Sequence, residues 1–127
     1  DYNRAMLLLA VLEKRGGLMV SGCDAYINVI GGLSLDEPAA DLAAIIAMAS
    51  SFRDKSVPSS LAAIGEVGLT GELRSVSALG QRLSEVRRLG FTQCLIPARN
   101  SARFQEPDGL QLIRVKNIRE ALAAVLT

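Results

Sequence analysis

Apolar and polar residues recur with the period of an α-helix in four segments of the chain. The first covers residues 3–15 and ends at Gly16-Gly17, and the third covers residues 78–89 and ends at Gly90. A glycine directly after a helical pattern is a common helix end, because it adopts the left-handed conformation without strain. The other two predicted helices cover residues 37–53 and 118–126, and Asn117 is expected to cap the last one.

The helix predicted for residues 37–53 is expected to lie at the centre of the molecule. From Ala39 to Ala49 its residues are apolar on nearly every side, with Asp41 as the exception. A helix that is apolar all round is usually buried. Asp36 is expected to cap its N-terminus, with Pro38 in the first turn.

Short apolar runs between glycines and prolines predict five or six strands. Thr70-Gly71 separates two of these runs and predicts a β-hairpin. Helices and strands together predict one α+β domain of mixed type that spans residues 1–127. The predicted strands lie at residues 18–21, 26–30 with a continuation at 33–35, 61–69, 72–76, 92–97 and 110–115.

Composition excludes several classes of function. Only 4% of the residues are aromatic and none is Trp, so a base-stacking platform for single strands is not expected. Histidine is absent and the two cysteines, Cys23 and Cys94, are far apart, so neither a zinc site nor a histidine-dependent catalytic centre is expected. Two distant cysteines indicate free thiols in a reducing cytoplasm. The sequence shows no signal peptide, and its longest apolar stretch, 42–49, is too short to cross a membrane.

Charge is distributed unevenly along the chain. Residues 1–73 carry five basic and nine acidic side chains, whereas residues 74–119 carry nine basic and three acidic ones. Such asymmetry points to an anionic partner, and arginine suits phosphate because its planar fork donates two parallel hydrogen bonds. The alternative is an ordinary solvated surface that happens to be rich in arginine. The candidate nucleic-acid-binding residues are Arg74, Arg82, Arg87, Arg88, Arg99 and Arg103.

The sequence contains no convincing motif for nucleotide binding or glycoside hydrolysis. A phosphate-binding loop would read GxxxxGK followed by Ser or Thr, and none is present, so this chain is not expected to hold ATP by that device. Neighbouring carboxylates do occur, as in Asp36/Glu37 and Glu66/Glu72. Nothing in their context marks them as a glycosidase pair, and we interpret them as structural.

Several blocks of sequence resemble a known family. Ala40-Asp41-Leu42-Ala43, the pair Asn3-Arg4 and above all Gly65-Glu-Val-Gly-Leu-Thr-Gly-Glu72 are similar to the Lon-like domain of the RadA/Sms family of bacterial DNA-repair proteins. The resemblance covers the whole chain. It implies the architecture of the Lon proteolytic domain, which is ribosomal protein S5 domain 2-like. A chain that starts at Asp1 without Met fits a domain taken from a longer protein.

The resemblance also implies that peptidase activity has been lost. Lon peptidases use a serine in a Gly-Pro-Ser-Ala-Gly context and a lysine general base about forty residues later. In this sequence Ala39 stands at the serine position, and an ungapped match places Gly80 at the lysine position. An alanine has no nucleophilic atom and a glycine no base, so no Ser/Lys dyad can form.

By the same resemblance, the full-length protein that contains this domain would be a DNA-dependent ATPase and branch-migration helicase in recombination and repair. Its upstream part would carry a zinc finger and a RecA-like ATPase that bind Zn, ATP and Mg, while this domain would hold no cofactor. Its expected partners are further copies of itself in a hexameric ring, single-stranded or branched DNA, and a RecA-type recombinase, with no membrane.

Three alternatives remain open at this stage. The chain could be an active Ser/Lys peptidase of the Lon family, which Ala39 and Gly80 disfavour. It could be an oligomerisation module without any role in DNA binding. It could also belong to another ATPase with a Lon-like domain, such as the magnesium-chelatase-like ComM group, although residues 65–72 fit RadA/Sms better.

Overall fold

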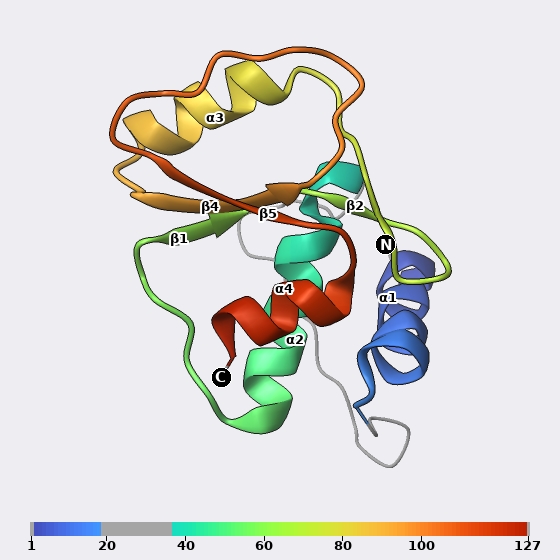
Figure 1. The fold of residues 1–127 in the computed structure, drawn as a ribbon. Coiled ribbons are helices and arrows are strands. Elements are labelled where there is room, and N and C mark those ends of the chain that lie inside the picture. Colours follow the sequence, from blue (N-terminus) through green and yellow to red (C-terminus); the bar gives the residue numbers. More distant parts are fainter. Residues whose placement is uncertain (1, 19–36, 127) are drawn as a thin grey trace.

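A computed structural model of the chain describes residues 2–18 and 37–126 (Figure 1). Its helices are α1 (Tyr2–Gly16), the 3₁₀ turn η2 (Pro38–Ala40), α2 (Asp41–Arg53), α3 (Leu79–Arg88) and α4 (Ile118–Val125). Its strands are β1 (Leu61–Ala63), β2 (Glu66–Val67), β3 (Leu73–Arg74), β4 (Gln93–Pro97) and β5 (Gln111–Val115). The chain is therefore a mixed α+β domain, as the sequence predicted.

A three-stranded parallel sheet lies between two layers of helix. Its strand order is β1-β4-β5, and β4 is the central strand because it pairs with both neighbours. Helix α3 covers one face of the sheet, while α1, α2 and α4 gather on the other (Figure 1). Strands β2 and β3 form a separate antiparallel pair around Thr70-Gly71.

The central strand divides the core into two parts. Cys94 and Ile96 belong to the apolar cluster beneath α3, whereas Leu95 belongs to the cluster formed with α1, α2 and α4. This alternation follows from the strand period of two, which sends successive side chains to opposite faces. Both faces of β4 are therefore buried, as is usual in a parallel sheet covered by helices.

The four predicted helices are confirmed, with one correction to the second. Residues 38–40 form the 3₁₀ turn η2, and the α-helix starts only at Asp41. Glu37 caps this turn, while the predicted cap Asp36 lies outside the described residues. Full burial of α2 was also wrong: Ala43 and Ala47 are exposed, because the sheet and its helices contact only the face that carries Leu42, Ile45, Ile46 and Ala49.

The strand predictions are confirmed in the second half of the chain and corrected at residues 61–69. That run splits into β1 and β2 at Gly65, because the backbone of Gly65 leaves the sheet to pair with η2 and α2. The Gly65 N–H donates to the Ala39 carbonyl at 3.0 Å, and the Leu42 N–H donates to the Gly65 carbonyl at 3.1 Å. The strands predicted at 26–30 and 33–35, and all but the first residue of 18–21, lie outside the described residues.

In the part of the chain that the structure describes, no helix has the length and apolar character needed to cross a membrane.

Candidate functional site

Ala39 lies in the tight turn η2, whose conformation is stabilised by Pro38 and Glu37. Pro38 starts the turn with its preset φ, and the Glu37 carboxylate accepts a long hydrogen bond of 3.5 Å from the Ala39 N–H. The side chain of Ala39 points into the apolar cluster beneath α3, and only 7% of the residue is exposed. The position that the resemblance matches to the Lon serine therefore carries a packed methyl group.

Gly80 lies in the first turn of α3, beneath the loop that follows β4. A Cβ atom at this position would stand 3.3 Å from the Phe104 Cβ, which is closer than most real contacts of this kind. A hollow of about 320 Å³ opens beside it, between residues 76–81 and residues 100–104. A side chain at position 80 would therefore crowd Phe104, which would have to shift by a few tenths of an ångström.

An ion pair joins the two segments that carry these positions. The Arg82 guanidinium in α3 donates to the Glu37 carboxylate at 2.8 Å and is held in place by the Ser77 carbonyl at 2.7 Å. The hydrogen bond from Arg82, helped by the Ala39 N–H, lowers the pKa of Glu37 below its ordinary value. The ion pair therefore connects the turn that carries Ala39 to the helix that carries Gly80.

Cys94 offers no replacement nucleophile. Its side chain is buried in β4 and the cysteine is free. Burial raises the pKa of the thiol to about 12, so it stays protonated at neutral pH and lacks the thiolate that attacks carbonyls. Cys23 lies outside the described residues.

The structure gives no metal-binding cluster within residues 2–18 and 37–126: no three His, Cys, Asp or Glu side chains come together there.

Four of the six predicted DNA-binding arginines have intramolecular partners. Arg74 pairs with Glu72 at 3.3 Å, Arg82 pairs with Glu37, and Arg88 pairs with Glu85 one helical turn away. Arg87 donates to the Asp108 carbonyl at 3.1 Å and lies across Gly109, whose missing side chain leaves room for it. These contacts hold the four arginines close to the protein surface.

The same contacts shift the pKa values of the acidic side chains Glu72 and Glu85. The Thr70 hydroxyl, with a smaller contribution from Arg74, lowers the pKa of Glu72. Arg88 lowers the pKa of Glu85 in the same way, and Glu85 raises the pKa of Arg88. The charges of these pairs offset each other locally, so the positive field of the basic half is weaker than its count of arginines implies.

Arg99 and Arg103 differ from the other four. Both are exposed in the loop between β4 and β5, and within the described residues neither forms a salt bridge or side-chain hydrogen bond. In Figure 1 this loop passes over the α3 side of the sheet, away from α1 and α4. These two side chains are therefore the members of the predicted set that are free to meet an external anion.

Sequence reasoning missed a buried ion pair that connects α1 to α2. Asp41 is 2% exposed, accepts from the Arg4 Nε at 3.0 Å and from the Val67 N–H at 3.0 Å, and forms a salt bridge with Arg4. Asn3-Arg4 and Ala40-Asp41 are two of the blocks that carried the resemblance, and the structure shows that they touch. No periodic pattern could have paired residues 37 positions apart.

Comparison with known proteins agrees with this architecture. Residues 21–127 match the family described as the Lon protease (S16) C-terminal proteolytic domain. The DNA repair protein RadA of Bacillus subtilis (strain 168) is 52% identical over 126 residues, which are 99% of this chain and 28% of that protein.

Further relatives carry the same name. The DNA repair protein RadA of Listeria monocytogenes is 48% identical over 126 residues, 99% of this chain and 28% of the relative. That of Streptococcus pneumoniae is 46% identical over 125 residues, 98% of this chain and 30% of the relative. The chain thus spans less than a third of the length of these curated relatives, and the resemblance stated from its sequence is confirmed.

Proposed function

This chain belongs to the Lon protease (S16) C-terminal proteolytic domain family, and from that premise we propose that it is a non-proteolytic scaffold domain of a RadA-type DNA-repair protein. Its role is to support ring assembly and to contact the DNA backbone. The whole-chain identity of 52% and 48% to two proteins named DNA repair protein RadA supports the assignment to repair. We also assign the fold to the ribosomal protein S5 domain 2-like class on the strength of the family match.

The observation that carries the non-proteolytic role is the state of the two dyad positions. Acyl transfer by a serine needs a hydroxyl and a base within hydrogen-bonding reach of each other. Ala39 supplies no hydroxyl, and Gly80, which lies against Phe104, supplies no base. The nearby charged pair, Glu37 with Arg82, is no substitute, because arginine is not deprotonated near neutral pH.

A peptidase assay tests this part of the proposal. The chain at high concentration is incubated with casein and fluorogenic peptides, alongside a serine-reactive fluorophosphonate probe. We expect neither turnover nor labelling. Turnover that the probe abolishes would refute a non-proteolytic role.

Contact with DNA rests on Arg99 and Arg103, which are exposed and have no protein partner among the described residues. Arginine binds phosphate by a fork of parallel donors, and the chain has few aromatic residues on which bases can stack. Binding should therefore be electrostatic, independent of sequence and salt-sensitive, with a Kd of ~10⁻⁴–10⁻⁶ M for a single domain. Several copies in a ring would strengthen it by avidity.

A second candidate function is subunit pairing, in which the arginines meet acidic groups of a neighbouring copy. The Arg82–Glu37 pair within one molecule illustrates the charge complementarity between the basic and acidic halves on which such pairing would depend. Large apolar side chains are exposed at four separate places along the chain and could contribute to such contacts. They are Met6, Phe52, Leu69 and Leu89.

Two charge-reversal variants separate these functions. R99E/R103E and R82E/R88E are compared by light scattering over a concentration series and by DNA affinity. Direct contact predicts that R99E/R103E loses DNA affinity while its assembly stays intact. DNA affinity that is unchanged while the oligomer dissociates would favour subunit pairing and contradict direct contact.

The remaining features of the larger protein are proposals from the family alone. We propose that the full protein is an ATP-dependent branch-migration helicase, that Zn, ATP and Mg bind outside this chain, and that a RecA-type recombinase is a partner. A reducing cytoplasmic compartment fits the free thiol of Cys94.

A further inference from the structure

The loop that carries Arg99 and Arg103 has little backbone structure of its own. It covers residues 98–110, between β4 and β5, and it runs over α3 in Figure 1. From residue 99 to residue 106 it forms no backbone–backbone hydrogen bond with any residue that the structure describes. Ordering such a segment costs conformational entropy, which its side-chain contacts have to offset. The position of the two arginines therefore depends on the side chains that fix the loop.

Polar contacts fix the two ends of this loop. Near its start, the Asn100 Nδ2 donates to the Pro97 carbonyl at 2.9 Å. Near its end, Glu106 pairs with Arg114 at 3.1 Å, and the Asp108 carbonyl accepts from α3. The side chains of the Glu106 pair are both exposed, and exposed ion pairs contribute little to stability. The middle of the loop therefore needs a different kind of contact.

Phe104 supplies apolar packing in the middle of the loop. It is the only large apolar side chain there before Leu110, and it packs against the apolar cluster beneath α3. A Cβ atom on Gly80 would stand 3.3 Å from the Phe104 Cβ, and its three nearest neighbours all belong to Phe104 and Gln105. Glycine is less favourable than alanine in a helix, so a reason is needed for its presence in α3. The close approach of the loop backbone supplies that reason.

We infer that Phe104 is a positioning residue: by packing against Gly80 it anchors the loop and holds Arg99 and Arg103 where they meet an anion. The position at which the resemblance places the Lon lysine is thus the contact point between this loop and α3. The inference rests on the proposed DNA contact and names the residue that prepares it. Without the anchor both arginines keep their charge, but they have to be ordered during binding, which weakens affinity.

A purely structural role for Phe104 is the competing explanation. In that case the loss of any partly buried side chain from the same cluster would lower stability without affecting the arginines. Leu112 offers a matched control, because it is a partly buried residue packed against that cluster and lies on β5, outside the loop.

The first test compares F104A with the control L112A and with the conservative variant F104L. Loop order is measured by the ¹⁵N heteronuclear NOE of the Arg99 and Arg103 amides, which reports fast motion. DNA affinity is measured by fluorescence anisotropy with a labelled duplex of mixed sequence. We expect F104A to lower the NOE and to weaken binding about 2- to 10-fold. The slope of log K against log salt should keep its wild-type value, since both phosphate contacts still form in the complex.

The control and the conservative variant decide between the two roles of Phe104. F104L should recover most of the wild-type NOE and affinity, and L112A should match the wild type in both even where its Tm falls. Wild-type NOE values in F104A would overturn the inference. Equal losses of DNA affinity in F104A and L112A would overturn it as well.

The contact between Gly80 and Phe104 is also tested in the absence of DNA. G80A adds one methyl group, which crowds Phe104 but is favourable for the helix. We expect G80A to shift the Arg103 amide signal, whereas Q81A at the exposed neighbouring position should not. We also expect G80A to raise Tm more in the F104A background than in the wild type. An unchanged Arg103 signal in G80A, or equal changes of Tm in the two backgrounds, would overturn the inference.

These measurements separate the inference from the proposed function. If the loop loses order in F104A while R99E/R103E binds DNA as the wild type does, the anchor is supported and the proposed DNA contact fails. If R99E/R103E loses DNA affinity while the loop of F104A stays ordered, the DNA contact is supported and the inference about Phe104 fails.

Discussion

Ala39 and Gly80 stand at the positions where the family resemblance places the Ser/Lys dyad, and we expect that restoring both side chains would not restore peptidase activity. A serine at position 39 would place a hydroxyl in an apolar cluster, and a lysine at position 80 would meet Phe104. We expect A39S/G80K to remain inactive towards fluorogenic peptides and fluorophosphonate, and to be less stable by about 1–3 kcal/mol, since a buried hydroxyl and overpacking are both unfavourable. Urea unfolding gives the stability difference.

The control for this variant is Q81K, which adds a lysine at the exposed neighbouring position of α3. It should unfold at nearly the same urea concentration as the wild type. Labelling of the A39S/G80K variant by the fluorophosphonate probe would contradict this prediction. It would show that the loop containing Phe104 can move enough to accommodate a lysine at position 80.

The buried pair of Arg4 and Asp41 is expected to dominate the stability of the contact between α1 and α2. Removing Asp41 leaves a buried Val67 N–H and a partly buried guanidinium without an acceptor. We expect D41A and R4A each to lower the free energy of unfolding by about 2–4 kcal/mol, and the double variant to lose less than the sum.

A double-mutant cycle by urea unfolding measures this coupling. D108A removes an exposed carboxylate from a loop and serves as the matched control. Strictly additive losses would show that Arg4 and Asp41 act independently.

At the scale of elements, the contact between η2 and α3 depends on pH through Glu37. Its pKa is lowered in the folded protein, chiefly by the hydrogen bond from Arg82. A lowered pKa contributes stability that is present above the unfolded value of about 4.3 and is lost as the pH falls through the folded value. We therefore expect the Tm difference between wild type and E37Q to narrow as the pH falls from 7 to 3.

The Arg82 partner provides the internal check on this effect. In an R82A background, E37Q should change Tm little at any pH, because the main cause of the shifted pKa is gone. A pH-independent difference between E37Q and the wild type would rule out the ion pair as its origin.

The elements that the sequence predicts best are those whose signals are local. The glycine at position 90 and the cap at Asn117 mark helix ends because they act on adjacent backbone groups: Gly90 has a φ of +100°, and the Asn117 side chain accepts from the Glu120 N–H at 2.9 Å. The break at Gly65 was missed because it depends on hydrogen bonds to Ala39 and Leu42, which are distant in sequence.

The sequence predicted which positions make up the candidate site, but it did not predict how their side chains are arranged in space. Ala39 and Gly80 followed from the family motif, but the cover provided by Phe104 did not, since a loop of irregular backbone has no periodicity. Equally, the charge count identified the basic half, whereas only the structure shows that Arg99 and Arg103 differ from their paired neighbours.

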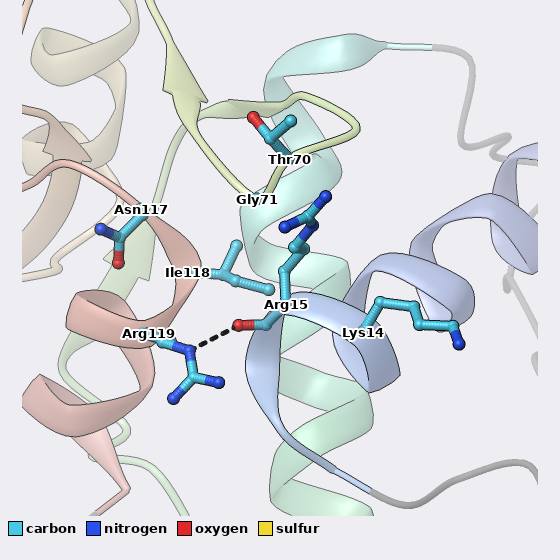
Figure 2. A pocket seen from close by; sticks show the side chains of 7 residues that line it. All are labelled: Lys14, Arg15, Thr70, Gly71, Asn117, Ile118 and Arg119. Atoms are coloured by element: carbon cyan, nitrogen blue, oxygen red, sulfur yellow. Dashed lines mark hydrogen bonds between the residues drawn. The ribbon is translucent and has the colours of Figure 1, made fainter.

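At the scale of the whole molecule, the domain carries two cationic surfaces on separate parts of one protease-like scaffold. One is the loop with Arg99 and Arg103 on the α3 side of the sheet (Figure 1). The other is a hollow of about 230 Å³ lined by Lys14, Arg15 and Arg119, where the end of α1 meets the start of α4 (Figure 2). The sheet lies between these two surfaces, with α3 on one face and α1 and α4 on the other.

The measurement that tests the central claim most directly is the salt dependence of DNA affinity for wild type and R99E/R103E. The same labelled duplex is titrated between 50 and 200 mM salt, roughly the range over which phosphate contacts are lost, with R53E/K55E as the charge-matched control. We predict that log K falls linearly with log salt in the wild type, and that R99E/R103E binds more weakly with a slope shallower by about 1.8, or 0.9 for each of two contacts. An R99E/R103E curve that coincides with the control would contradict the account.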